Sequence, residues 1–373
     1  PDAIGSAWSE ASYVAGLYLK ARTPYPQVIP HFIYDYHTYH VRRGDTLQPG
    51  WQAALDIGCG PGQLAIHLST RFRRVLGIDP SEGMIALAET VKALGKEVLS
   101  SNGLPEVTQD SVIDYRKGFG ESTNLSGKSV DLIVLGASAH CLDWSSPSAT
   151  SSIWREWARI LRPGGSLIIT GTRPIVGPFV GPDGEKVGPL RDWLQNFALP
   201  PSPLATFYDQ RVTEKSIGGG TMYSKIPMPW EQEDGDLCEL WDSESKVHLV
   251  IDDPSPLNRS NQRIPSWASP ALIRAIRGDN SNRDLIVTRT SPKHLTAWIR
   301  STSGYRKMLE ENFDQRLLAL EERDVAAVEM KRICDESGIG WEEEMECHHP
   351  GTVLAIRRTR KEFPLGEATI KGT

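Results

Sequence analysis

The chain has 373 residues, of which 39% are hydrophobic and 24% charged, and a formal net charge of −6 at pH 7. These values are ordinary for a globular protein and exclude disordered and fibrous classes. The acidic balance argues against a surface that neutralises many phosphates, so we expect a small-molecule partner and no nucleic acid. Five scattered cysteines without a CxxC pair favour reduced thiols and a cytoplasmic location. A run of about 18 apolar residues is lacking, so we predict no membrane span.

Two helices are predicted before the first strand, over residues 7–22 and 30–40. The segment between them contains Pro24 and Pro26, through which a helix cannot continue. We expect residues 1–45 to form a helical lid over the mouth of a ligand site.

The segment 54–63, Ala-Leu-Asp-Ile-Gly-Cys-Gly-Pro-Gly-Gln, predicts a strand that runs into a glycine turn opening a helix. Three glycines at alternate positions allow a tight turn and a close approach of backbone to ligand. The dinucleotide fingerprint G-x-G-x-x-G is not matched, because its sixth position is Gln63. Asp79 ends the next apolar run, 21 residues after Gly58, where a carboxylate can accept both hydroxyls of a ribose. A nucleoside ligand is therefore predicted.

Helices are predicted over residues 64–70 and, with Ser81 as the N-terminal cap, up to Gly95. The alternation of apolar runs with helical segments indicates right-handed parallel crossovers. We therefore predict an α/β fold with a doubly wound, mostly parallel sheet.

At this point the chain resembles the class I S-adenosylmethionine-dependent methyltransferases, whose first motif is similar to residues 55–62. Matches to the third strand and adenine-contacting turn (112–121), the fourth strand (130–135) and the helix and fifth strand (154–170) follow in the family's order. The resemblance covers residues 50–172. It implies a Rossmann-like sheet of seven strands, with S-adenosylmethionine as cofactor and S-adenosylhomocysteine as product. The implied cofactor-binding residues are Asp56, Gly58, Cys59, Gly60, Gly62, Asp79, Pro80, Met84, Gly120, Glu121, Gly136 and Ala137.

A narrower resemblance is to small-molecule enzymes of the trans-aconitate methyltransferase type. It rests on an aromatic, an arginine and a Tyr-Pro pair near the start, a histidine after the fourth strand, and a helix like residues 294–305. Cys141 stands where those relatives usually carry tryptophan. The acceptor-side residues that it implies are Tyr18, Arg22, Tyr25, Trp144, Trp298, Arg300 and Tyr305. Four of them also have a structural interpretation: Tyr18 and Tyr25 could pack helix on helix, Arg22 could pair with a surface acid, and Trp298 could belong to the core.

His140 is the candidate catalytic residue, because it follows the fourth strand at the carboxyl edge of a parallel sheet. A phenol or alcohol acceptor would need this histidine to take its proton, whereas a carboxylate acceptor would need an arginine such as Arg300 to orient it. The alternative is a histidine that binds a backbone carbonyl and shapes the loop. No metal is expected, since the histidines of residues 30–40 lack a cysteine or carboxylate at ligand spacing.

The resemblance, taken with these observations, predicts transfer of a methyl group to an oxygen (hydroxyl, enol or carboxylate) of a small organic acceptor of the secondary-metabolite kind. Methylation of nitrogen or carbon, a non-methylating rearrangement, and a binding protein without turnover remain alternatives. The oligomeric state stays open.

Four regions are expected: the lid at 1–45, the cofactor-binding core at 46–173, an inserted cap at 174–283 and the C-terminal part of the core at 284–373. The cap region contains several aromatic residues and matches no motif. In the last region, residues 283–288 and 352–357 are predicted to form the antiparallel pair that closes the sheet. A helix over 313–334 is expected to pack on it.

Overall fold

The computed structural model describes residues 25, 28–39, 50–107, 110–172, 175–177, 182–208, 223–251, 265–270, 272–273, 287–302, 304–305, 307–308, 324–348 and 351–361. The predicted helix over residues 7–22, with Tyr18 and Arg22, lies outside these residues.

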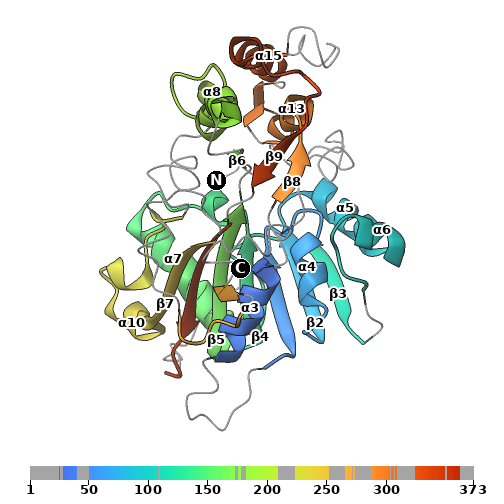
Figure 1. The fold of residues 1–373 in the computed structure, drawn as a ribbon. Helices are drawn as coiled ribbons and strands as arrows, with labels where there is room; N and C mark the ends of the chain where they lie inside the picture. The colour runs from blue at the N-terminus through green and yellow to red at the C-terminus, as the bar shows by residue number, and fades with distance from the viewer. Residues whose placement is uncertain are drawn as a thin grey trace.

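A seven-stranded sheet with the order β3-β2-β1-β4-β5-β10-β7 forms the centre of the molecule (Figure 1). Five strands are parallel: β1 (Ala53–Ile57), β2 (Arg74–Asp79), β3 (Val112–Lys117), β4 (Val130–Gly136) and β5 (Leu161–Thr172). The last two strands, β10 (Gly351–Arg358) and β7 (Trp241–Ile251), are antiparallel to their neighbours. The predicted doubly wound, mostly parallel Rossmann-like sheet is confirmed.

Helices cover both faces of this sheet. One face carries α3 (Val28–Tyr39), α4 (Gln63–Leu68) and α5 (Glu82–Lys92), which is followed by α6 (Lys96–Ser101); the other carries α7 (Pro147–Ile160) and α10 (Gly235–Glu239). Side chains alternate across a strand, so Leu132 and Val134 of β4 join the first core while Ile133 and Leu135 join the second. Burial on both faces explains why these strands read as continuous apolar runs.

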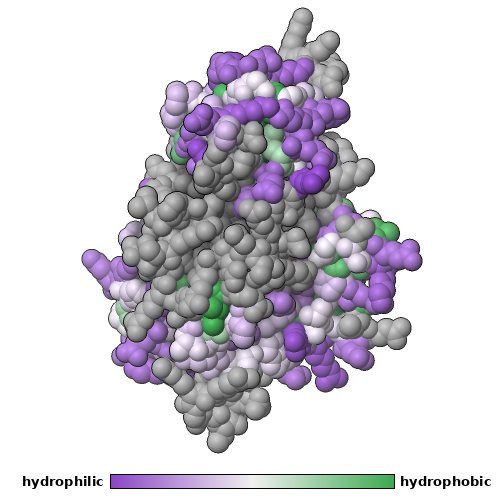
Figure 2. All heavy atoms as spheres, in the orientation of Figure 1, coloured by the Kyte–Doolittle hydropathy of each residue, from purple (hydrophilic) through white to green (hydrophobic). Residues whose placement is uncertain are grey.

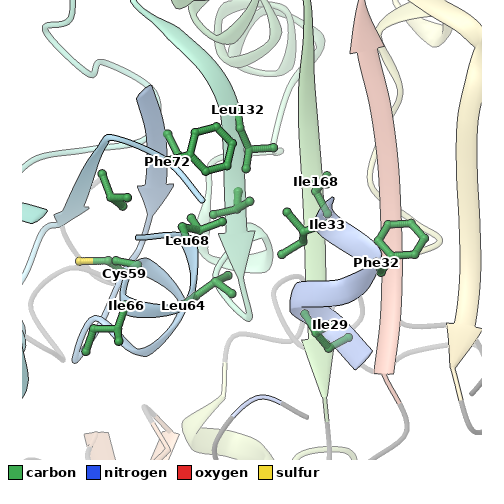
Figure 3. Close-up of a cluster of buried hydrophobic side chains, with 14 of the residues drawn as sticks. Ile29, Phe32, Ile33, Cys59, Leu64, Ile66, Leu68, Phe72, Leu132 and Ile168 are labelled. Carbon is green, nitrogen blue, oxygen red and sulfur yellow. The ribbon is translucent and has the colours of Figure 1, made fainter. Parts of the chain in front are cut away.

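The predicted position of α3 over the ligand mouth is wrong. Figure 3 shows Ile29, Phe32 and Ile33 of this helix packed beside Ile168 of β5. All four side chains are fully buried. The helix lies flat on the sheet because its apolar residues recur at helical spacing and need one broad apolar surface to cover.

The predicted partner of β10 is also wrong. β10 pairs with β7, from the region expected to be a cap, while β8 (Val287–Thr290) belongs to a second sheet of order β6-β9-β8. That sheet includes β6 (Ile175–Val176) and β9 (Met345–His348). The error has a physical cause, since β7 is an edge strand whose first half, Trp-Asp-Ser-Glu-Ser-Lys, is largely polar, as edge strands often are.

The second sheet forms a smaller lobe with α8 (Pro182–Asn196), α13 (Pro292–Arg300) and α15 (Val325–Ser337). The lobe leaves the core at the carboxyl edge of the parallel strands, because β6 begins directly after β5 and β9 ends directly before β10 (Figure 1). Contrary to expectation, α15 packs in this lobe and not on the large sheet. Sequence reasoning missed α8 because a proline, Pro189, lies inside it. Hydrophilic side chains cover much of the lobe's described surface (Figure 2).

Two buried histidines predict a loss of stability in acid. Burial lowers the pKa of both His37 and His67 from 6.5 to about 4, helped by the positive charge of Arg357 at His37 and by His31 at His67. Because the unfolded histidines titrate near 6.5, the stabilisation is complete above that pH and is lost as the pH falls toward 4. Each histidine contributes on the order of 3 kcal/mol to this loss.

The measurement is urea unfolding of wild type and His67→Leu between about pH 7.5 and 4.5. We expect the free energy of unfolding of the wild type to fall relative to that of the variant across this range. The control is leucine at His294, which is exposed. If the difference in the free energy of unfolding between wild type and His67→Leu does not change with pH, the expectation is contradicted.

Candidate active site

Three glycines shape the loop between β1 and α4. Gly58, Gly60 and Gly62 have φ angles of +67°, +51° and +79°, a region that side chains rarely adopt. A Cβ at Gly58 would lie 2.4 Å from Cβ of Ser138, and one at Gly62 would lie 2.2 Å from the hydroxyl of Tyr115. Among the described residues, nothing lies within 4 Å of where a Cβ at Gly60 would be. Gly58 and Gly62 are therefore required by packing, while no described atom covers Gly60, so a ligand can approach its backbone there.

Asp79, at the end of β2, lies beside this loop. Its Oδ2 accepts a hydrogen bond from the Gly60 amide at 3.0 Å, and its Oδ1 accepts one from the Ser81 amide at 2.9 Å. Burial raises the pKa of Asp79, while these two N–H groups lower it. The Asp79 carboxylate therefore binds the backbone of Gly60 and the start of α5 at the same time. It also lies next to the side of Gly60 that no described atom covers.

Asp56 is a second carboxylate near the same loop. It is 1% exposed, and neither of its oxygens has a hydrogen-bond partner among the described residues. Burial raises its pKa to about 7, with a further increase from Asp79 and a decrease from the nearby Ala65 amide. A buried polar group without a partner is costly. The carboxyl group of Asp56 is therefore a candidate partner for a ligand that brings a positive charge or a hydrogen-bond donor.

The loop after β4 contacts the glycine loop. The Ser138 hydroxyl donates to the Ile57 carbonyl at 2.6 Å, and its Cβ adjoins Gly58. The preceding residue, Ala137, has a φ of +52°, a conformation that costs a non-glycine residue on the order of 1–3 kcal/mol. Since the chain winds in opposite directions from β1 and β4, this is the switch point at which ligands bind in such sheets. Tyr25 lies there too, with its hydroxyl 2.4 Å from where a Gly136 Cβ would be.

His140 lies in this same loop, on the short helix η1 (Ala139–Cys141). Its Nδ1 is 3.4 Å from the hydroxyl of Tyr223, and the two rings are stacked with 20° between their planes. Tyr223 was not among the predicted site residues. It belongs to the region expected to be a cap, and one tyrosine among many aromatic residues gives no sequence signal.

The remaining predicted cofactor residues follow the carboxyl ends of β1, β2 and β3. The Gly120 carbonyl accepts a hydrogen bond from the indole of Trp157 at 2.9 Å, and Glu121 accepts one from the Asp143 amide at 3.3 Å. Met84 is buried in the first turn of α5, after the half-buried Pro80. Burial raises the pKa of the Cys59 thiol well above its ordinary value, which makes Cys59 a packing residue and not a reactive thiolate.

The structure places Trp144 in the core and not on an acceptor surface. It is 6% exposed and packs against Trp154 and Trp157. Its indole donates to the Ala139 carbonyl at 2.7 Å. Trp144 therefore holds the loop that carries His140 against the hydrophobic core.

Trp298, Arg300 and Tyr305 belong to the core of the smaller lobe. The Arg300 guanidinium is 2.9 Å from Asp324, with 8% and 9% of the two side chains exposed, and Tyr305 donates to the same carboxylate. Trp298 packs edge-on against Phe197. Arg300 already faces a buried acid, so the prediction that it orients an acceptor carboxylate is not supported by its surroundings.

Removal of Asp324 is expected to destabilise the smaller lobe. Its Oδ1 also accepts a hydrogen bond from the Ala327 amide and caps α15. Asp324→Ala removes the acid that pairs with the buried Arg300, and removal of one member of a buried ion pair typically costs about 3–5 kcal/mol. We expect a protease to cleave this lobe faster in the variant than in wild type, and we expect the variant to have a lower melting temperature. Glu344→Ala, which breaks an exposed pair with Arg289, should change neither; equal effects of the two variants would contradict the account.

Comparisons with known proteins agree with this geometry. Residues 55–169 match the sequence model of the methyltransferase domain family. This segment therefore resembles a methyltransferase domain. A Dictyostelium discoideum protein named as a methyltransferase is 33% identical over 116 residues, which are 31% of this chain and 35% of that protein. The protein CRG1 of Saccharomyces cerevisiae, named as an S-adenosylmethionine-dependent methyltransferase, is 28% identical over 117 residues, 31% of this chain and 34% of that protein. The chain thus matches about a third of the length of these relatives.

Two solved structures are also similar to the chain. One, described as a type II methyltransferase from Anaeromyxobacter dehalogenans, is 16% identical, with a TM-score of 0.49 over 90% of this chain and 97% of that one. The other, a SAM-dependent methyltransferase from Aquifex aeolicus, is 24% identical, with a TM-score of 0.25 over 36% of this chain and 63% of that one.

The residues around the glycine loop fit S-adenosylmethionine, the cofactor that the methyltransferase domain implies. The cofactor carries an ammonium and a sulfonium cation and a ribose diol, for which the loop offers the buried Asp56 carboxyl group, the backbone of Gly60 and the Asp79 carboxylate. In the part of the chain that the structure describes, no group of three or more histidine, cysteine or acidic side chains could hold a metal ion. No described helix combines the length and apolar character that a membrane crossing needs.

Proposed function

We propose that this chain is an S-adenosylmethionine-dependent methyltransferase that methylates an oxygen of a small organic acceptor. The observation that carries the cofactor assignment is Asp56, a buried carboxyl group whose oxygens have no hydrogen-bond partner among the described residues, next to a glycine loop whose Gly60 no described atom covers. The match of residues 55–169 to the methyltransferase domain supports the reaction type.

In this proposal the chain's own residues align two reactants. Asp56 and Asp79 attract and hold the cationic cofactor, which supplies an electrophilic methyl group on a sulfonium when bound. The loop of residues 137–144 then presents the acceptor oxygen behind the methyl carbon. Alignment of this kind can supply roughly 7–11 kcal/mol of the rate acceleration, and His140 holds the acceptor oxygen or takes its proton.

Oxygen is the favoured acceptor atom because the candidate catalytic residue is a histidine beside an aromatic ring, His140 with Tyr223. A histidine can hold an acceptor oxygen through a hydrogen bond or remove its proton. The narrower resemblance to trans-aconitate methyltransferases stays a prediction, since Arg300, expected to orient a carboxylate, is paired with Asp324.

The test is incubation of the purified protein with S-adenosylmethionine that carries a deuterated methyl group, in the presence of a cell extract, followed by mass spectrometry. We expect S-adenosylhomocysteine and a labelled small molecule whose label lies on oxygen. His140→Ala should lower the turnover by about 10²-fold or more and leave the affinity for the cofactor within about twofold, as measured by calorimetry. A labelled nitrogen or carbon would refute the acceptor atom, and an unlabelled new product would refute methyl transfer.

A further inference from the structure

Tyr223 reaches the loop after β4 from a distant part of the sequence. It is 83 positions beyond His140 in the chain, 1% exposed, and held among the apolar side chains of the second core. Its φ of +65° is rare for a residue with a side chain, and such conformations concentrate at functional sites. The near-parallel stacking of the two rings fixes the plane of the imidazole as well as its position.

The burial of Tyr223 decides the direction of its hydrogen bond. The hydroxyl has one proton to donate, and the partner that the described residues give it is Nδ1 of His140, at 3.4 Å. A buried donor left unsatisfied is costly. Burial also raises the pKa of Tyr223 well above its ordinary value, so the phenol keeps its proton. Donation requires a lone pair at Nδ1, which places the proton of the neutral imidazole on Nε2.

We propose that Tyr223 is a positioning residue that holds His140 in the Nε2–H tautomer, so that His140 donates a hydrogen bond to the acceptor oxygen instead of taking its proton. This inference rests on the proposed function and narrows its substrate class. A nitrogen that carries a proton has no lone pair with which to accept another. The acceptor oxygen must therefore be ionised when it arrives, as in a carboxylate or an acidic enol, and neutral alcohols are excluded.

The direct test is nitrogen-15 NMR of the histidine side chains in wild type, Tyr223→Phe and His140→Gln, the last of which assigns the signals of His140. The wild type should show the Nε2–H pattern for His140, and Tyr223→Phe, which keeps the ring and removes the hydroxyl, should lose that preference. The matched control is Tyr36→Phe, whose buried hydroxyl donates to the Ser245 carbonyl, and which should leave His140 unchanged. An Nδ1–H pattern in wild type, or an unchanged pattern in Tyr223→Phe, would overturn the proposal.

A kinetic readout separates this inference from the proposed function. With an acceptor identified by the labelling experiment, Tyr223→Phe should lower kcat about tenfold and leave the KM for S-adenosylmethionine unchanged, and the acceptor should be an acid ionised at neutral pH. If the tautomer is as proposed but no labelled product forms, the proposed function fails and the positioning role stands. If methyl transfer occurs to a neutral alcohol, the function stands and the inference fails.

Discussion

Replacement of Asp79 by alanine is expected to weaken the binding of S-adenosylhomocysteine by about 10²-fold or more. The carboxylate holds the amides of Gly60 and Ser81, and hydrogen bonds to a charged group are worth about 1.5–3 kcal/mol each. Without the two hydrogen bonds to Asp79, the Gly60 backbone loses its fixed orientation. The ribose of the ligand also loses its proposed hydrogen-bond acceptor. The measurement is isothermal titration calorimetry with the product, which avoids turnover.

Two further variants make this test specific. Asp79→Asn keeps one acceptor oxygen and should bind with an affinity between those of wild type and Asp79→Ala. Asp114→Ala removes an exposed carboxylate from the neighbouring strand β3 and should bind as tightly as wild type. Equal affinities of Asp79→Ala and wild type, with melting temperatures that show both to be folded, would remove Asp79 from the cofactor site.

The affinity for S-adenosylmethionine should rise with pH because of Asp56. Burial raises the pKa of this group to about 7, so a large share of the ligand-free protein is protonated there at neutral pH. A cation favours the ionised carboxylate, and binding therefore releases a proton. From about pH 6 to 7, where the ligand's α-amino group stays largely protonated, the affinity should increase severalfold. Calorimetry in buffers of different ionisation enthalpy measures the proton release directly.

Asp56→Asn should abolish both the pH dependence and the proton release, and it should also stabilise the ligand-free protein at alkaline pH. Asp56 has a folded pKa above its ordinary 3.8, so its ionisation disfavours the folded state, and the stability that it contributes is lost as the pH rises through about 7. The full effect is on the order of 4 kcal/mol. The stability prediction is contradicted if, at about pH 8.5, the urea midpoint of unfolding of Asp56→Asn is equal to or below that of wild type. The binding prediction is contradicted if proton release persists in the variant.

The core of the fold could be predicted from the sequence because the residues that define it lie close together in the chain. Residues 53–79 combine two buried strands, a glycine turn and a strand-end acid, and each feature is fixed by neighbouring residues. Ser81 caps α5 as predicted, with its hydroxyl accepting a hydrogen bond from the Met84 amide at 3.3 Å.

The parts that sequence reasoning missed depend on distant contacts. β7 pairs with β10 across about a hundred residues of chain, and its polar first half gives no strand signal at an edge. The side chain of Arg300 meets Asp324 only after α13 and α15 have packed together, so spacing alone could not reveal that it was already paired. Tyr223 likewise contacts His140 only in the folded protein, and no sequence motif links the two residues.

The most direct test of the central claim is an experimental structure of the protein with S-adenosylhomocysteine. We expect the ligand over Gly60, with its ribose hydroxyls on the Asp79 carboxylate and its ammonium group within reach of Asp56. A ligand bound elsewhere, or side chains that fill the space above Gly60 in the complex, would contradict the account.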